Sequence, residues 1–316
     1  MNTAADSDAL LSVVVVIVSD TLEPRARSDD LAGCLEALER QVAAPPLDVI
    51  VPHHPGTDGI EALKQRFPGV RFIAVDDPDL AVRAAGSRDH HDRLRARGLA
   101  EARGEIVALL EDHARPDPSW SARIAAAHRR GDDAAIGGAI ENGVDRALNW
   151  AVYFCDFSKY QNPLPSGPSP FASDANVAYK RAALESVRSL WGRSFREVIV
   201  HRALSAVGGI ALDPGIVVYQ QRSGLSLASA LRERFVWGRS YAATRSMELG
   251  ASRRLLYATL SPVLPLVMVE RMALTAWRRR RHFVRFIRAL PLVVLLACAW
   301  SAGECAGYAG SSPAGR

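Results

Sequence analysis

The sequence predicts an α/β fold with a mostly parallel central sheet flanked by helices, followed by an apolar and basic helical extension. Short apolar runs alternate with segments of helical periodicity in the first third of the chain, and a later run ends in a cluster of charged side chains. The last third combines apolar segments with many arginines. With 316 residues, 48% of them hydrophobic and 23% charged, the chain can form one folded core with an appendage, or two domains.

Strands and helices are expected to alternate at the start of the chain. The valine-rich segment Leu11–Val18 favours a strand, and Leu47–Val51 and Val70–Val75 are two further short apolar runs. Residues 28–42 carry apolar side chains at helical spacing, and Ile60–Phe67 forms a second, shorter helical segment. This β-α-β-α-β order is typical of a parallel sheet that is buried on both faces.

A later strand ends in two carboxylates and an imidazole. The apolar run Ile106–Leu110 is followed directly by Glu111, Asp112 and His113. If the extended backbone continues, Glu111 and His113 point to one side and Asp112 to the other. Carboxylate oxygen and imidazole nitrogen suit Mn²⁺ or a similar divalent ion, and α/β sheets bind ligands at the carboxyl ends of their strands. The alternative is a charged strand end that enters a loop.

Residues 100–120 read A-E-A-R-G-E-I-V-A-L-L-E-D-H-A-R-P-D-P-S-W. This segment resembles the metal-binding strand of the family 2 glycosyltransferases, whose usual pattern is A-x-G-E-x-(apolar)-x-x-L-D-x-D followed by Pro and Trp. Glu111 replaces the first Asp and His113 the last, and other GT-A enzymes bind metal through a D-x-H version. The resemblance covers roughly Leu11 to Arg245. It implies the Rossmann-like GT-A fold and a divalent cation, Mn²⁺ or Mg²⁺, at Glu111 and His113.

The resemblance also implies contacts with a donor nucleotide in the loops after the first two strands. Ser19 and Asp20 follow the first strand. After the second strand many relatives carry an acidic D-D-G-S, whereas this chain reads P-H-H-P at residues 52–55, with Asp58 further on. Either these histidines or Asp58 take over the contact with the base, or the nucleotide is held differently. The histidines alternatively are solvated loop residues.

Four further residues are expected at the donor. Arg95 stands where relatives carry an Arg near the donor diphosphate, which a guanidinium matches well. Asp112 belongs to the metal motif, and Asn176 lies in an N-x-A-x-x-R pattern that borders the donor sugar and acceptor in relatives. Arg234 lies in a segment that closes over the diphosphate in membrane-attached relatives. Arg95 could instead be part of a charged helical face, and Arg234 part of an ordinary amphipathic helix.

Glu197 is the candidate general base. It precedes His201 by four residues, so the two side chains share one face of a helix. In the family, an acidic residue opens this helix and acts as the base; relatives often carry E-D, whereas Val198 follows Glu197 here. An inverting transfer needs one carboxylate to accept the proton of the attacking hydroxyl. The alternative is a surface glutamate paired with Arg193 or His201.

The C-terminal region predicts membrane association. Residues 222–288 contain fourteen arginines and three glutamates, a balance that suits an anionic surface. The apolar segment Leu255–Val269 is shorter than the ~20 residues that span a bilayer and has basic flanks on both sides, which favours an interfacial or re-entrant position. Ala289–Gly310 is long enough for one crossing, although Glu304 interrupts it. The two segments could instead pack together as a dimerisation hairpin.

These observations predict a GT-A domain over residues 1–245 and a membrane-associating helical region over residues 246–316. The expected activity is inverting transfer of a hexose from a nucleotide-diphosphate sugar to a lipid-linked or polysaccharide acceptor of the cell envelope, at the cytoplasmic membrane face. Scattered cysteines and an N-terminus without signal-peptide features agree with that side of the membrane. The alternative is a catalytically inactive GT-A-like protein that binds sugar nucleotides. A nucleic-acid partner is not expected, because no recognition motif accompanies the arginines.

Overall fold

The computed structural model describes residues 10–18, 29–76, 89–246 and 249–310. Within them the strands form one mixed sheet in the order β3-β2-β1-β4-β8-β6-β9-β5, with β7 paired to β9. The strands are β1 (Leu11–Val16), β2 (Leu47–His53), β3 (Arg71–Ala74), β4 (Ile106–Glu111), β5 (Ala114–Pro116), β6 (Ala135–Asn142), β7 (Gly167–Pro168), β8 (Asn176–Lys180) and β9 (Ile210–Gln220).

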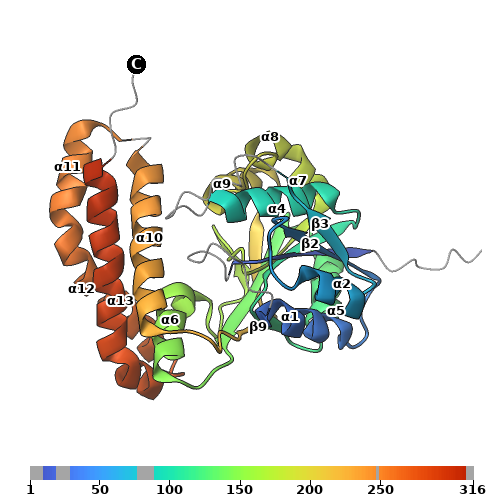
Figure 1. Cartoon of the computed structure of the whole chain (residues 1–316), viewed down its shortest axis with the longest axis horizontal. Coiled ribbons are helices and arrows are strands. Elements are labelled where there is room, and N and C mark those ends of the chain that lie inside the picture. Colours follow the sequence, from blue (N-terminus) through green and yellow to red (C-terminus); the bar gives the residue numbers. More distant parts are fainter. Residues whose placement is uncertain (1–9, 19–28, 77–88, 247–248, 311–316) are drawn as a thin grey trace, which may run out of the picture.

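Helices cover both faces of this sheet, and a group of long helices stands beside it (Figure 1). The helices are α1 (Asp29–Glu39), α2 (Ile60–Arg66), α4 (Asp89–Glu101), α5 (Trp120–Arg130), α6 (Ala147–Phe157), α7 (Arg181–Ser186), α8 (Arg188–Trp191), α9 (Glu197–Val207), α10 (Leu227–Ser246), α11 (Ala251–Leu260), α12 (Leu264–Arg278) and α13 (Phe283–Gly310). The α/β fold class with a C-terminal helical extension is therefore confirmed.

The first half of the sheet is parallel, as the alternation of strands and helices predicted. β3, β2, β1 and β4 run in the same direction, and the register places Val16 of β1 beside Glu111 of β4. The second half is mixed, because β8 runs antiparallel to both β4 and β6 while β9 runs parallel to β6. The segment that carries Asn176 is thus a strand, which the sequence analysis had noted only as a motif.

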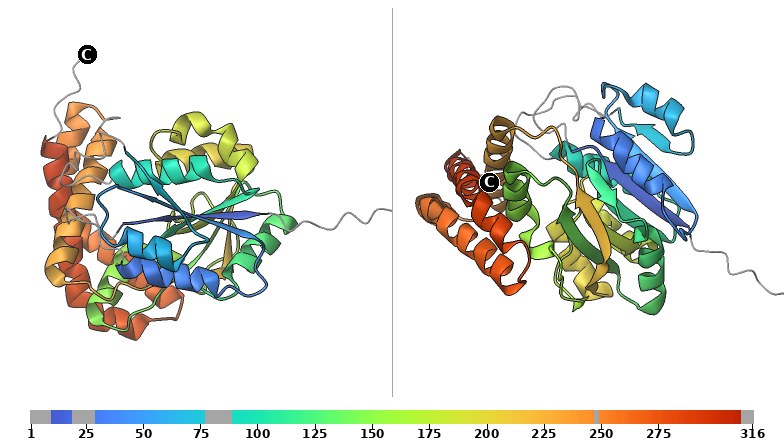
Figure 2. Two further views of the ribbon diagram at one scale, coloured as in Figure 1. Left: turned by 45° about the vertical axis from the view of Figure 1, so that its right-hand side comes forward. Right: turned by 90° about the horizontal axis from the view of Figure 1, so that it is seen from below.

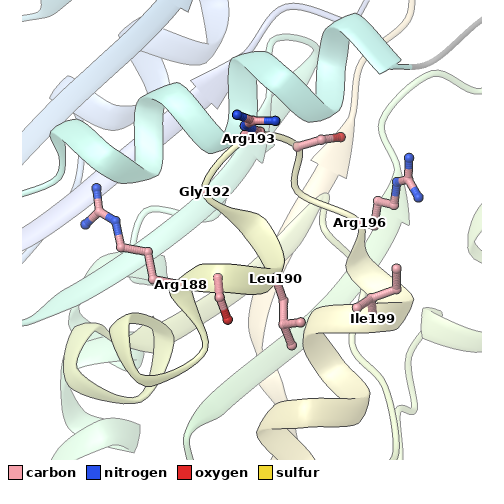
Figure 3. Close-up of a pocket in the computed structure, with 8 residues that line it drawn as sticks. Arg188, Leu190, Gly192, Arg193, Arg196 and Ile199 are labelled. Carbon is pink, nitrogen blue, oxygen red and sulfur yellow. The ribbon is translucent and has the colours of Figure 1, made fainter.

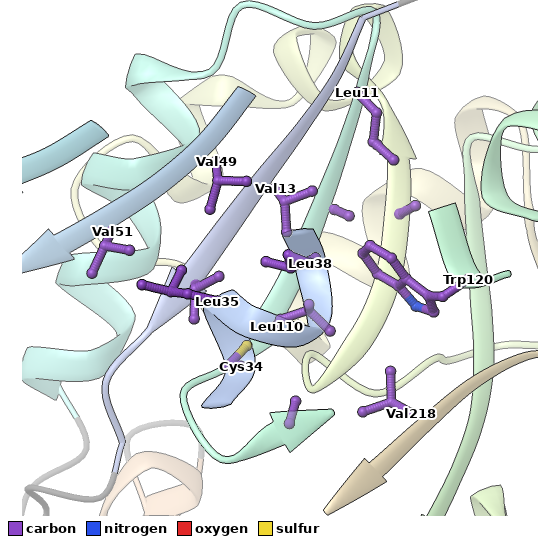
Figure 4. Packing of buried hydrophobic residues seen from close by; sticks show 14 of the residues in the cluster. Leu11, Val13, Cys34, Leu35, Leu38, Val49, Val51, Leu110, Trp120 and Val218 are labelled. Atoms are coloured by element: carbon purple, nitrogen blue, oxygen red, sulfur yellow. The ribbon is translucent and has the colours of Figure 1, made fainter. Parts of the chain in front are cut away.

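Both faces of β1 are buried, which explains its unbroken run of valines. Val13 and Val15 pack with α1 and α5 in one hydrophobic cluster, while Val14 and Val16 belong to a second cluster on the other face. Figure 4 shows the first cluster, in which Trp120 of α5 packs with side chains of the strands and of α1. Figure 2 shows α4 on one side of the sheet and α1 and α2 on the other. Because both faces of β1 and β4 are buried, packing fixes the positions of these strands and of their carboxyl ends.

A third hydrophobic cluster joins the sheet domain to the C-terminal helices. Trp150 and Phe154 of α6 pack with Met272 of α12 and with Phe286 and Val293 of α13. The helices α10, α12 and α13 lie side by side in Figure 1 and in both views of Figure 2. The cluster gives α6 a dual role, because it packs against Ile140 of β6 on one side and against α12 and α13 on the other.

The C-terminal apolar segments are longer than expected. α11, a short 3₁₀ turn and α12 follow one another as a helical run from Ala251 to Arg278, and α13 runs from Phe283 to Gly310; each is 28 residues long. Pro262 and Pro265 fall in the first turns of the 3₁₀ segment and of α12, where a missing N–H costs no hydrogen bond. Both runs are long and apolar enough to cross a bilayer, so the short length expected for Leu255–Val269 was wrong.

Glycines allow α10 and α13 to touch backbone to backbone. A Cβ atom on Gly303 of α13 would lie 2.1 Å from the carbonyl oxygen of Phe235, and one on Gly238 of α10 would lie 2.2 Å from that of Trp300. Gly307 follows one turn after Gly303 on the same face. These contacts form a small-residue seam of the kind that brings two helices close together.

The variant Gly303→Ala is expected to lower the stability of the protein, although alanine is the better helix former. The added methyl group collides with the Phe235 carbonyl, and such overpacking costs about 1–3 kcal/mol. Gly310→Ala, on the same helix with no atom within 4 Å of the new Cβ, should be neutral or stabilising. Thermal denaturation of both variants checks the contrast, and equal melting temperatures would contradict the proposed seam.

Candidate functional site

The carboxyl ends of β1 and β4 meet at the predicted metal motif. The backbone N–H of Asp112 donates a hydrogen bond to the carbonyl of Val16 at 2.9 Å. The N–H of Val18 in turn donates to the Asp112 carboxylate at 3.2 Å. The carboxyl end of β1 therefore lies next to the motif. Ser19 and Asp20, expected at the donor nucleotide, lie outside the described residues.

Glu111, Asp112 and His113 converge. β4 ends at Glu111 and the chain turns at Asp112 and His113, so the expectation that Asp112 points away from the other two was wrong. The ring of His113 lies between the two carboxylates: Nε2 is 3.3 Å from Glu111 Oε2, and Nδ1 is 3.2 Å from Asp112 Oδ1. All three side chains are buried. Burial alone would lower the pKa of His113, but the hydrogen bond with Asp112 and the charge of Glu111 raise it.

This arrangement fits two ligands of a divalent cation. Two atoms that are each about 2.1 Å from an ion at a right angle lie about 3.0 Å apart, close to the separation of Glu111 Oε2 and His113 Nε2. Asp112 holds the other ring nitrogen, as carboxylates commonly do for metal-bound histidines. In the described part of the chain, no group of three or more His, Cys, Asp or Glu side chains is arranged to hold a metal. A cation here would need further ligands from substrate or water.

Arg95 connects the motif to other carboxylates. The side chain is 1% exposed, and Nη2 lies 3.4 Å from Glu111 Oε1 and 3.1 Å from Asp174 Oδ2. Nη1 lies 3.2 Å from Asp92 Oδ1 in the same helix. Burial opposes the charged form, but the surrounding carboxylates outweigh it and raise the pKa of Arg95. The guanidinium that was expected at a donor diphosphate thus faces acidic side chains of the protein itself.

Asp174 is a member of this group that the sequence analysis missed. It lies two residues before Asn176, and the motif around Asn176 was read for its amide alone. An acid next to that motif was the available signal. Its position opposite Glu111 across one guanidinium became visible only once β8 was paired antiparallel to β4.

Glu197 opens helix α9, as predicted. Its carboxylate is close enough to Arg95 to contribute to the raised pKa of that guanidinium, so Glu197 belongs to the same charged group. Glu197 Oε1 is 4.0 Å from His201 Nδ1, but burial lowers the pKa of His201 to about 4. The imidazole is therefore neutral at pH 7, and the expected alternative of a Glu197–His201 ion pair is not favoured. With 30% of its side chain exposed, Glu197 is accessible to solvent.

Asn176 and Arg234 have structural partners. The buried amide of Asn176 accepts a hydrogen bond from Trp120 Nε1 at 2.9 Å and donates to the carbonyls of Ala139 and Ile216 at 2.8 and 3.0 Å, which joins β8 to α5, β6 and β9. Arg234 of α10 forms a two-pronged ion pair with Asp156 of α6. These contacts account for both residues without a ligand.

Asp58 lies apart from the group described so far. It is exposed in the turn that follows β2, directly before α2. Its expected contact with the donor base stays a prediction.

A second ion pair lies beside the motif. Arg222 follows β9 in the chain. The residue before it, Gln221, donates a backbone hydrogen bond to the carbonyl of His113 at 2.8 Å. Arg222 Nη2 is 2.9 Å from Glu233 Oε2 of α10. Burial acts to raise the pKa of Glu233, but the positive charges of Arg222 and Arg234 outweigh burial and lower the pKa below its usual value. The carboxylate is therefore charged. The pair brings α10 to the edge of the site, and Arg222 was missed because a single Arg after a strand carries no motif.

The sheet order, the helices on both faces and the acid–imidazole motif at the end of β4 define the class of GT-A glycosyltransferases. Residues 16–188 match the model of the family "Glycosyl transferase family 2". The chain therefore belongs to glycosyl transferase family 2, an inverting family whose members transfer a sugar from a nucleotide sugar.

A solved structure with the same fold is a mannosyltransferase from Pyrobaculum calidifontis in complex with GDP-mannose and Mn²⁺. The similarity covers 92% of this chain and 85% of that chain, with a TM-score of 0.51 and 15% sequence identity. At that identity the similarity shows the fold alone. No curated protein matches the sequence significantly.

Replacing Arg95 is expected to destabilise the protein strongly, because Glu111 and Asp174 would both lose the buried guanidinium that they share. Removing one partner of a buried ion pair costs about 3–5 kcal/mol, so Arg95→Met should lose that much free energy of unfolding. Arg97→Ala is the matched control: Arg97 lies on the same helix, is 52% exposed and, among the described residues, pairs only with Glu101, a contact worth at most about 0.5 kcal/mol. Equal denaturation midpoints for the two variants would refute the bridging role of Arg95.

Proposed function

We propose that the protein transfers a hexose from a nucleotide-diphosphate sugar to a hydroxyl of a lipid-linked or cell-envelope acceptor at the cytoplasmic face of the membrane, with inversion at the anomeric carbon. The observation that carries the proposal is the ion pair of Glu111 with the buried guanidinium of Arg95, whose raised pKa also reflects the negative charge of Glu197. This electrostatic link supports a single site for the motif proposed for metal and diphosphate and the carboxylate proposed for proton transfer, although 85 residues of chain separate Glu111 from Glu197.

Glu111 and His113 would hold Mn²⁺ or Mg²⁺, and Asp112 would orient the imidazole. When bound, such an ion supplies positive charge that stabilises the departing diphosphate. Arg222 lies at the same edge and carries a partly exposed guanidinium, which we propose as a further cationic contact for the donor. The GDP-mannose and Mn²⁺ of the structurally similar mannosyltransferase support this reading of the site.

Glu197 would act on the acceptor. As the acceptor oxygen forms a bond to the anomeric carbon, the bond from that carbon to the diphosphate breaks on the opposite side, and the hydroxyl proton moves to the Glu197 carboxylate. One displacement inverts the anomeric centre. Its solvent exposure and the neutral state of His201 support Glu197 in this role, since no protonated imidazole competes for the carboxylate.

The variant Glu197→Gln is expected to lower sugar transfer by about 10²–10⁴-fold, because the amide cannot accept the proton. Donor binding should persist, since Glu197 is not proposed to contact the diphosphate. Glu105→Gln, an exposed glutamate before β4, serves as the control and should retain full activity. Release of nucleoside diphosphate, measured over a panel of nucleotide sugars, checks the assignment. Unchanged transfer by Glu197→Gln would remove it, and donor binding without any transfer by the wild type would favour the inactive sugar-nucleotide-binding alternative.

Loss of His113 should abolish metal-dependent donor binding. In the wild type, a matching nucleotide sugar together with Mn²⁺ is expected to raise the melting temperature, because ligands that bind only the native state stabilise it. His113→Ala should lose this increase, and so should the wild type in the presence of EDTA. An increase of equal size in His113→Ala would show that the acid–imidazole motif does not hold the ion.

Membrane attachment rests on the outer face of α11–α13. Large apolar side chains are exposed along these helices, among them Leu266 at 74%, Trp277 at 66% and Val284 at 62%. The exposed arginines Arg253 and Arg278 lie near the two ends of the α11–α12 run. An apolar face with cationic ends fits an anionic lipid surface, with the helices either lying in the interface or crossing it.

Not every arginine of the 278–281 run is available to lipid. Arg279 donates hydrogen bonds to the carbonyls of Lys159, Gln161 and Pro163, and Arg281 lies 3.3 Å from the carboxylate of Glu141. These two side chains fasten the turn between α12 and α13 to the sheet domain. Of the arginines in this run, Arg278 and Arg280 are exposed and stay available to anionic headgroups.

The double variant Trp277→Glu, Val284→Glu is expected to weaken binding to vesicles that contain anionic lipid, because it places two carboxylates on the apolar face. Val207→Glu on α9 is the control: Val207 is also more than half exposed but lies outside the helical group. Co-sedimentation with vesicles compares the three proteins. Equal sedimentation of the double variant and the wild type would contradict attachment through this face.

A further inference from the structure

A pocket of about 580 Å³ lies at α8 and the start of α9, outside the group formed by the metal motif and Arg95. Three arginines, Arg188, Arg193 and Arg196, line it together with two serines and a glycine. Two exposed apolar side chains, Leu190 and Ile199, complete the lining. Figure 3 shows the three guanidinium groups around the upper part of the pocket and the two apolar side chains below them. The pocket thus combines a cationic side with an apolar side.

Two of the three guanidinium groups have no hydrogen-bond or ion-pair partner among the described residues. Arg188 pairs with Glu185 at 2.8 Å and lies over the ring of Trp191. Arg193 and Arg196, in contrast, form no hydrogen bond or ion pair with any of the residues that the structure describes, and both are exposed. Unpaired guanidinium groups that line one pocket favour an anion, and their planar donor arrangement matches phosphate oxygens.

The pocket adjoins the proposed base. Arg196 immediately precedes Glu197, and Ile199 lies in the first turn of the same helix. An anion bound at Arg196 would therefore lie at the N-terminal end of α9, the helix that opens with the proposed base. The metal motif and Arg222, which are proposed for the donor, lie on other elements of the fold. This separation assigns the pocket to the acceptor side of the reaction.

We infer that this pocket binds a phosphate group of the acceptor, with Arg193 and Arg196 as the principal contacts. The inference rests on the proposed function, because it takes Glu197 as the residue that meets the acceptor hydroxyl. The phosphate itself is unchanged in the reaction; it anchors the acceptor while a hydroxyl elsewhere on the molecule is delivered to Glu197. Leu190 and Ile199 offer an apolar surface for a hydrocarbon chain beside the phosphate, so the favoured acceptor is an amphiphilic phosphate or phosphodiester.

The test measures binding of dodecyl phosphate and of glycerol phosphate to the full chain by calorimetry in phosphate-free buffer. The double variant Arg193→Ala, Arg196→Ala is expected to bind both phosphates at least about tenfold more weakly than the wild type, since each lost guanidinium removes a charge-assisted contact. Arg202→Ala, which removes an exposed arginine from the same helix outside the pocket, should bind as the wild type does. Because the apolar helices remain in all these proteins, any unspecific uptake of dodecyl phosphate is equal among them.

A lysine pair tests whether charge suffices. Arg193→Lys, Arg196→Lys should retain part of the affinity, and melting temperatures equal to that of the wild type show that the variants are folded. Tighter binding of dodecyl phosphate than of glycerol phosphate, with the difference lost in Leu190→Ala, Ile199→Ala, identifies a lipid phosphate. Equal binding of the two identifies a soluble phosphorylated acceptor.

Wild-type affinity in the double alanine variant, or no phosphate binding by the wild type, overturns the inference. Neither result depends on donor turnover, so it is distinguishable from failure of the proposed function. Glu197→Gln should bind dodecyl phosphate normally while it loses transfer, and the alanine pair should raise the KM for a phosphorylated acceptor and leave donor binding intact.

Discussion

One buried guanidinium holds the candidate site together. Arg95 lies within 3.4 Å of carboxylates from β4, from the segment before β8 and from its own helix, and Glu197 of α9 contributes to the same electrostatic group. The carboxylates of Asp92, Glu111 and Asp174 could not be brought this close without a counter-charge, because their repulsion in a poorly solvated interior is costly. Arg95 therefore allows the end of β4 and the start of α9 to share one site. The apolar clusters on both faces of β1 and β4 then keep the strand ends in place.

The helical group α10–α13 is joined to this site as well as to the core. Glu233 of α10 pairs with Arg222 beside the metal motif, and Arg234 of the same helix pairs with Asp156 of α6. Between α12 and α13, Arg281 and His282 both contact the carboxylate of Glu141 in β6, and the ring of His282 lies 3.1 Å from it. Ionic contacts that are largely shielded from solvent thus accompany the hydrophobic cluster of α6, α12 and α13. Such contacts have strict geometric requirements, which favours one arrangement of the helices on the sheet.

Local patterns in the sequence were sufficient for the strands β1 to β4 and for the start of α9, whereas the metal site at the end of β4 stays a prediction. β1 and β4 are buried on both faces, so their apolar runs carry an unambiguous signal, and Glu197 stands at a helix start that periodicity reveals. The turn at Asp112 and His113 was not predictable, because alternation along a strand holds only while the backbone stays extended.

Partners far apart in the chain were out of reach for the same kind of reason. No local pattern in the sequence indicates that Arg95 pairs with Asp174, or that the Asn176 amide hydrogen-bonds to Trp120 and two carbonyls. The same holds for the contacts of Arg279 and Arg281 with the sheet domain. Composition describes an arginine run as a uniform patch of charge. The fold divides it into side chains that bind the protein and side chains that face outward.

The docking of Arg279 has a consequence for how the enzyme meets its surroundings. This side chain donates hydrogen bonds to three carbonyls between Lys159 and Pro163, on the segment that links α6 to the proline-rich loop. The sheet domain is therefore held rigidly against the apolar helices. On the proposed membrane surface, the candidate site would therefore lie at a fixed distance and orientation from the lipid. The acceptor would then have to extend over that distance itself, because the position of the site would not adjust to it.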